Sequence, residues 1–206
     1  MKLREKNLKI LKNNHVYSEE MEHDACGVGV IVSTEGKKSR TIVEYGIEAL
    51  KAVWHRGAVD ADGKTGDGAG IHLEIPKDFF IEKIEVTGHE HDNSEICVGM
   101  IFLPRNDYSA QETCKTIVES ELTKNNFSIY GWRQVPVNPK ILGEKAFQTM
   151  PEIMQVLFKS NDKNLLDKNL ERKIYETRKK IENKAFQLSL NNFYICSISS
   201  KSIIYK

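Results

Sequence analysis

The chain has 206 residues, enough for one large domain or two small ones, and 40% of them are hydrophobic, which suffices for a buried core. Thirty Lys and Arg residues balance twenty-nine Asp and Glu residues, so the formal net charge is +1. A net charge this close to zero argues against nucleic acid or an acidic membrane surface as a partner.

The N-terminal stretch is interrupted by charged or amide residues at short intervals, and no later segment approaches the ~20 apolar residues of a membrane span. We therefore expect a cytoplasmic protein. The four cysteines are far apart and form no CxxC pair, which argues against a zinc cluster or a disulfide framework. They are Cys26, Cys97, Cys114 and Cys196.

The first 25 residues form a charged leader, Lys-rich and then acidic, before the first apolar segment. Residues 26–32 are an apolar run of strand length, and we expect the globular part to begin there. Apolar residues then recur at spacings of four, three and four, which predicts an amphipathic helix that ends near Gly57. These residues are Val43, Ile47, Leu50 and Trp54.

Residues 57–70 hold five glycines and three aspartates, so we predict a loop that closely approaches another group. Residues 71–75 alternate between apolar and polar and predict a half-buried strand, whereas residues 96–103 predict a fully buried one. The polar residues 88–94 form an exposed connection between them.

The second half predicts further helices and strands. Ser109 and Glu112 have capping-box spacing and precede a helical stripe, and a longer helix begins near Leu166. Residues 127–137 and 193–198 read as strands, while 153–158 are too few to distinguish strand from helix. Paired strands separated by helices predict an α+β fold with mainly antiparallel sheets.

The Gly-rich segment does not have the residue spacing of a phosphate-binding or a calcium-binding motif. Gly57 and Gly63 enclose five residues where a Walker loop has four, and a calcium loop would need glycine at Thr65 and glutamate at Ile71. His89 and His91 lie in a polar linker, where a solvated pair is the ordinary explanation. We predict no metal site within this chain.

Cys26 stands at the junction between the charged leader and the first predicted strand. If the leader is removed before it, one residue carries both the thiol and a free α-amino group. The amine, with a pKa of ~7.7–8.0, can accept the proton of a thiol whose pKa is ~8.5. A buried structural cysteine is the alternative, and spacing alone favours it.

Several sequence blocks resemble the start of glutamate synthase large subunits in order and spacing, from about Cys26 to the last residue. They are His23-Asp-Ala-Cys26-Gly-Val-Gly29, Trp54-His-Arg-Gly57, Ala61-Asp-Gly-Lys-Thr-Gly-Asp-Gly-Ala-Gly70, Val98-Gly-Met-Ile-Phe-Leu-Pro104, Tyr130-Gly-Trp-Arg-Gln-Val-Pro136, Leu142-Gly-Glu-Lys-Ala146 and Phe193-Tyr-Ile-Cys-Ser197.

This resemblance implies a class II glutamine amidotransferase domain of the N-terminal-nucleophile type, an αββα four-layer sandwich present here only in part. Residues 1–25 would be the leader and residues 26–206 the N-terminal portion of the domain. Cys26 would attack the glutamine side-chain amide, form a thioester and release ammonia.

Arg56 and Gly57 would lie beside Cys26 and support it, although Arg56 also fits a helix-end cation facing the helix dipole. Asp60, Asp62 and Asp67 receive no catalytic role, since they can simply fold the loop.

For the whole enzyme, the resemblance implies that ammonia passes to a distant site that converts 2-oxoglutarate to glutamate. FMN, iron–sulfur clusters and NADPH, supplied through a small subunit, would serve that site, and none of these cofactors is expected within this chain. The amino-acid sequence of residues 51–62 resembles NADPH-dependent glutamate synthases more than ferredoxin-dependent ones.

Two other functions are compatible with the sequence: a non-catalytic binding module that keeps the fold, or the glutaminase of another class II amidotransferase. The apolar end of the chain, residues 202–206, favours a domain that continues beyond it. The family's substrate-carboxylate arginine and its Asn-Gly oxyanion pair have no counterpart between Cys26 and Lys206. We therefore expect these residues alone to be inactive.

Overall fold

The computed structural model describes residues 5–7, 9, 10 and 27–206. Its elements form one four-stranded and one two-stranded sheet, both antiparallel, together with helices. In chain order they are α2 (Arg40–Ala52), η1 (Trp54–Arg56), β1 (Ile71–Glu74), α3 (Lys77–Val86), β2 (Cys97–Leu103), α4 (Tyr108–Lys124), β3 (Phe127–Gln134), η2 (Pro139–Ile141), α5 (Glu144–Thr149), β4 (Glu152–Ser160), α6 (Asp167–Gln187), β5 (Tyr194–Ser199) and β6 (Ser202–Tyr205).

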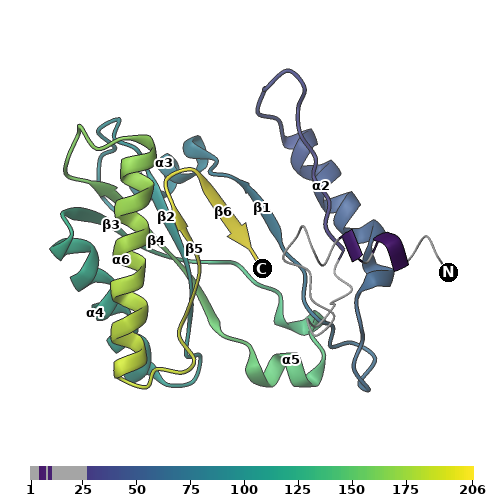
Figure 1. Cartoon of the computed structure of the whole chain (residues 1–206). Coiled ribbons are helices and arrows are strands. Elements are labelled where there is room, and N and C mark those ends of the chain that lie inside the picture. The colour runs from purple at the N-terminus through teal and green to yellow at the C-terminus, as the bar shows by residue number, and fades with distance from the viewer. Residues whose placement is uncertain (1–4, 8, 11–26) are drawn as a thin grey trace.

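The elements stack in four layers (Figure 1). Helices α4 and α6 cover one face of the sheet β3-β4-β2-β5, and the pair β1-β6 lies on its other side, followed by α2. The two antiparallel sheets between helices confirm the predicted α+β fold. The second sheet has two strands in the described part of the chain.

Strand β2 is buried on both of its faces, as predicted from its uninterrupted apolar sequence. Ile101 and Leu103 belong to the core beneath α4 and α6, whereas Val98 and Met100 belong to the core shared with α3 and β6. A strand covered on both sides needs no polar alternation. This strand therefore joins the two cores and holds the layers together.

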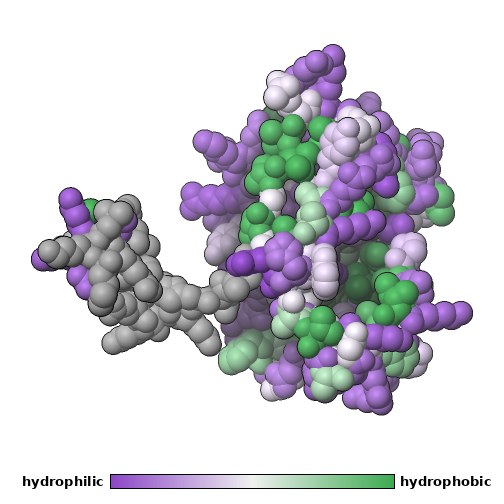
Figure 2. Space-filling model, turned by 90° about the vertical axis from the view of Figure 1, so that its right-hand side faces the viewer, coloured by the Kyte–Doolittle hydropathy of each residue, from purple (hydrophilic) through white to green (hydrophobic). Residues whose placement is uncertain are grey.

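The strand predicted for the segment after Cys26 is wrong for its described part, residues 27–32. Val28 and Val30 are 88% and 80% exposed, because no described strand pairs with this segment. Figure 2 looks onto the side that carries α2, where hydrophobic side chains gather at the surface. Residues with a high strand propensity form a strand only when the edge of another strand is available for pairing, and this segment has no such partner among the described strands.

Two helix predictions also need correction. Helix α4 is capped by Asp107, whose side chain accepts a hydrogen bond from Ala110 N, so Ser109 lies inside the helix and forms no capping box. Helix α3 was not predicted, although Phe80 and Ile84 lie four residues apart and are both fully buried. A ten-residue helix has too few periodic positions to stand out from its flanks.

The ambiguous residues 153–158 lie within β4, an inner strand of the larger sheet. The helix predicted from Leu166 is α6, with Leu170, Ile174 and Ile181 buried on its inner face. No helix in the described part of the chain is long and apolar enough to cross a membrane.

Helices α4 and α6 are joined by an ion pair at the edge of the core. Glu121 of α4 is 5% exposed, accepts a hydrogen bond from Lys184 Nζ of α6, and lies 3.6 Å from Lys124 Nζ. The bond from Lys184 holds the pKa of the Glu121 carboxyl below its ordinary value. The pair therefore favours the folded state when Glu121 is ionised.

We expect Glu121→Gln to weaken the dependence of folding stability on pH. The depressed pKa means that the pair contributes stability above the unfolded value of ~4.3, and that this stability is lost as pH falls below it. The contribution should be on the order of 1 kcal/mol, because Lys184 is 38% exposed.

Urea unfolding at pH 7 and pH 3 measures this effect. The unmodified protein should lose more stability between the two pH values than Glu121→Gln does. Glu176→Gln is the matched control, since Glu176 pairs with Arg172 at 3.0 Å on the exposed face of α6. Equal losses in the unmodified protein and Glu121→Gln would contradict the assignment.

Candidate active site

Arg56 and Gly57 follow α2 at a sharp change in chain direction. Ser39 caps α2 by accepting a hydrogen bond from Thr41 N, and the helix turns into η1 at Val53. Gly57 N closes η1 on the carbonyl of Trp54 at 3.0 Å, as expected for a helix stop. Trp54, predicted on the buried helix face, is instead 76% exposed, because the chain leaves the α-helix before it.

Gly27 brings the start of the predicted domain to this turn. A Cβ placed on Gly27 would lie 3.2 Å from Val53 Cβ and 3.4 Å from Arg56 Cβ, so its backbone packs against both residues. Cys26 lies outside the described residues. Its immediate neighbour in sequence is nevertheless in contact with the residue that the resemblance placed beside the nucleophile.

Arg56 is exposed, and within the described part of the chain its side chain has no hydrogen-bond or ion-pair partner. Its position at the end of η1 fits both interpretations that the sequence left open, active-site support and a cation facing a helix end. Gly57 has an ordinary extended backbone with φ −87°, so its conformation does not require glycine.

The other three cysteines are poor candidates for a nucleophile. Cys97, Cys114 and Cys196 are free and buried. Burial raises the pKa of the Cys114 thiol to about 11 and raises the pKa values of Cys97 and Cys196 as well. A thiol that stays protonated and shielded is unreactive.

The aspartates of the Gly-rich loop fold it, as predicted. The base of the loop is closed by Ala58 N, which donates to Asp67 Oδ2 at 2.7 Å, and by the bridge between Val59 and Gly66. Because Ala58 follows Gly57 directly, these bonds fix the backbone beside Arg56. Residues 57–70 are thus a hydrogen-bonded hairpin without regular strands.

At the tip of the hairpin, Asp62 and Thr65 form a compact turn. Asp62 Oδ1 accepts from Lys64 N at 2.9 Å and Thr65 N at 2.7 Å, while Asp62 Oδ2 accepts from Thr65 Oγ1 at 2.6 Å. The Thr65 hydroxyl, followed by these backbone groups, holds the pKa of the Asp62 carboxyl well below its ordinary value. Asp62 is therefore an ionised acceptor at neutral pH.

The histidines at positions 89 and 91 are more ordered than the predicted solvated pair. His91 Nε2 lies 3.0 Å from the Ser94 carbonyl oxygen and His89 Nδ1 lies 3.1 Å from Thr87 Oγ1, and both rings contact Tyr130. Among the residues that the structure describes, no three potential metal ligands gather at one point.

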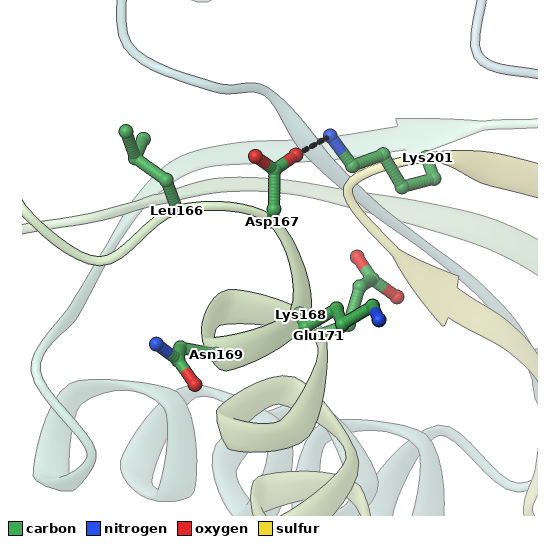
Figure 3. A pocket seen from close by; sticks show the side chains of 6 residues that line it. All are labelled: Leu166, Asp167, Lys168, Asn169, Glu171 and Lys201. Atoms are coloured by element: carbon green, nitrogen blue, oxygen red, sulfur yellow. Dashed lines mark hydrogen bonds and ion pairs between the residues drawn. The ribbon is translucent and has the colours of Figure 1, made fainter.

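A surface hollow at the N-terminus of α6 is separate from this site. It lies where the N-terminus of α6 meets the turn between β5 and β6, and Asp167 and Lys201 across its rim pair at 2.8 Å (Figure 3). Glu171 in the hollow already accepts hydrogen bonds from Ser199 and Ser200. Its charged groups thus serve the fold.

Comparison with known families shows which family the chain belongs to. The profile of the family described as Glutamine amidotransferases class-II matches residues 26–206. The chain belongs to this family. The match covers every structural element described above and includes Cys26, Arg56 and Gly57.

This class-II amidotransferase is similar to much longer proteins. It is 52% identical over 200 residues, or 97% of its length, to the glutamate synthase [NADPH] large chain of Azospirillum brasilense. It is 37% identical over 205 residues to a ferredoxin-dependent glutamate synthase of Pyropia yezoensis, and 39% identical over 187 residues to one of Arabidopsis thaliana, covering 96% and 90% of the chain. The chain spans 11–13% of the length of these relatives.

The sequence predicted Arg56 and Gly57 as site residues of this class-II amidotransferase but did not indicate the long-range contacts of their loop. The tip at Asp62 and Thr65 packs on Gly143, about eighty residues later in the chain. The only available signal was that both segments belong to blocks shared with glutamate synthases. Sequence similarity of a block to other proteins does not reveal which residues the block contacts in the folded chain.

Proposed function

We propose that this chain is the glutaminase part of a glutamate synthase, with Cys26 as its nucleophile. The observation that carries the proposal is the 52% identity to a glutamate synthase large chain across nearly the whole sequence. The contact of Gly27 with Arg56 supports it, because that contact ties the backbone next to Cys26 to the turn at the end of η1.

In the proposed reaction, the leader 1–25 is removed and the new α-amino group of Cys26 accepts the thiol proton. The thiolate attacks the carbon of the glutamine side-chain amide. The carbon–nitrogen bond then breaks as the protonated α-amino group gives its proton to the leaving nitrogen, which releases ammonia and leaves a thioester. Water then hydrolyses the thioester to glutamate and restores the thiol. Arg56 orients the N-terminal residue through the contact of its side-chain Cβ with Gly27, and Gly57 ends the turn that carries Arg56.

The rest of the reaction belongs to the longer protein. There, ammonia passes to 2-oxoglutarate, and FMN, iron–sulfur clusters and NADPH from a small subunit supply the reducing equivalents. Identity of 52% to an NADPH-dependent chain against 37% and 39% to ferredoxin-dependent ones supports the NADPH branch. We assign the protein to the cytoplasm.

The test of the proposed function is the N-terminus of the active enzyme. We expect intact-mass measurement and N-terminal sequencing of the full-length cellular protein to show a chain that begins at Cys26. An internal cysteine has an amide nitrogen in place of the amine, so it lacks the base that the mechanism requires. Glutamine hydrolysis by enzyme that retains Met1 to Ala25 would contradict the mechanism.

A further inference from the structure

The start of the domain and α2 are weakly anchored to the rest of the fold. Helix α2 has no fully buried residue, and its main neighbours are β1 and η1. The segment 27–32 is exposed and unpaired among the described strands. A nucleophile attached to Gly27 therefore needs a further connection to the core if its position is to be fixed to within a fraction of an ångström.

The hairpin 57–70 provides this connection. Its base begins at Gly57, the residue after Arg56, and its tip reaches the N-terminal end of α5. Helix α5 leads directly into β4, an inner strand of the four-stranded sheet. Figure 1 shows α5 at the lower edge of the molecule, extending from the sheet toward the side that carries α2. The hairpin thus links the proposed catalytic turn to α5, and α5 continues through residues 150 and 151 into β4.

Thr65 makes the contact at the tip through one hydroxyl group with two partners. Thr65 Oγ1 donates to Asp62 Oδ2 at 2.6 Å within the hairpin and accepts from Ala146 N of α5 at 3.4 Å. Lys145 adds an ion pair with Asp60 at 2.6 Å, but this pair is solvent-exposed and contributes little. The Asp62 carboxylate also accepts a hydrogen bond from the Lys145 backbone, so the Thr65 hydroxyl joins the hairpin to α5 both directly and by holding Asp62 in place.

Gly143 permits this contact because it has no side chain. A Cβ at position 143 would lie 2.2 Å from Thr65 Oγ1, 2.4 Å from Asp62 Oδ2 and 2.5 Å from Thr65 N. The last of these is a backbone atom, so a side-chain rotation could not relieve the overlap. Any residue larger than glycine must push the hairpin tip away from α5.

We propose that Thr65, seated on Gly143, is a positioning residue for the glutaminase reaction: it fixes the hairpin against α5 and thereby holds Arg56 and Gly27 where Cys26 can react. The proposal rests on the proposed function and deepens it. Thr65 itself acts through the backbone of residues 57–60 and touches neither substrate nor thiol in this role.

The test compares Thr65→Val with Thr65→Ser in the full-length enzyme. Valine has nearly the same shape as threonine but loses both hydrogen bonds, whereas serine keeps the hydroxyl. We expect Thr65→Val to lower kcat/KM for glutamine-dependent synthesis by ~10- to 100-fold, mainly through kcat, because misplaced reacting groups lose effective molarity. Thr65→Ser should stay within about threefold of the unmodified enzyme, and ammonia-dependent synthesis should not change in either variant.

A double-mutant cycle with Gly143→Ala shows whether the two residues act through one contact. If they do, the double variant Thr65→Val/Gly143→Ala should be no worse than the more damaged single variant, whereas independent effects would multiply. Thr149→Val is the matched control, since its hydroxyl bonds only the carbonyls of Lys145 and Ala146 within α5. It should leave both activities unchanged.

The outcomes separate this proposal from the proposed function. Loss of glutamine-dependent synthesis in Cys26→Ala with full activity in Thr65→Val would overturn the positioning role and leave the glutaminase assignment intact. Equal damage by valine and serine, or parallel loss of the ammonia-dependent activity, would also overturn it. Retention of glutamine-dependent synthesis by Cys26→Ala would instead overturn the glutaminase assignment.

Discussion

Replacing Cys26 by alanine in the full-length enzyme should abolish glutamine-dependent glutamate synthesis and leave ammonia-dependent synthesis measurable. The thiol is needed to break the amide bond of glutamine and has no part in the reduction at the second site. Removal of a nucleophile that acts together with its base typically costs ~10⁴-fold or more in rate. Steady-state assays with glutamine and with ammonium as the nitrogen source measure the two activities separately.

Cys114→Ala is the control for Cys26→Ala. Cys114 is fully buried on α4, where burial raises its pKa to about 11 and alanine suits the helix. This variant should retain both activities. Equal loss of both activities in Cys26→Ala would show that Cys26 serves the structure, and retention of both would remove it as the nucleophile.

Phe158→Ala should destabilise the fold more than any surface change. Phe158 lies on β4 with no exposed surface, and its ring meets that of Phe127 edge-on at 5.3 Å between centroids. Deleting a buried phenylalanine ring costs about 3–5 kcal/mol, from lost burial and the cavity that remains. A domain with about 5–15 kcal/mol of total stability would lose a large part of it.

Urea unfolding and soluble yield measure this loss, and Phe186→Ala is the matched control. Phe186 lies near the end of α6 with 84% of its surface exposed. Its removal should change the free energy of unfolding by less than about 0.5 kcal/mol. Comparable effects of the two substitutions would mean that β4 is not at the centre of the core.

Local periodicity was sufficient for the long elements of this chain. The stripe of Leu170, Ile174 and Ile181 predicted α6, and the uninterrupted apolar run of residues 96–103 predicted the buried strand β2. Both signals depend on neighbours within a few residues, which is the range over which sequence pattern reports burial. The short helix α3 and the N-cap of α4 were not predicted correctly, because too few residues carry the pattern that separates them from a loop.

The chemistry of the site was readable from motif order, since the blocks around Cys26 and Arg56 identify a glutamine amidotransferase. Motif order does not place those blocks in space. The structure shows Gly27 against Arg56 and the hairpin tip against Gly143, contacts that join segments about thirty and eighty residues apart.

The sequence by itself therefore determined the class of chemistry, the proposed nucleophile and the main helices and strands. Only the tertiary structure decided that residues 27–32 lack a described strand partner and that Thr65 seats on Gly143. The reason is physical: strand pairing and close backbone contact depend on which edges and surfaces the folded chain brings together, and a single segment carries no information about its distant neighbour.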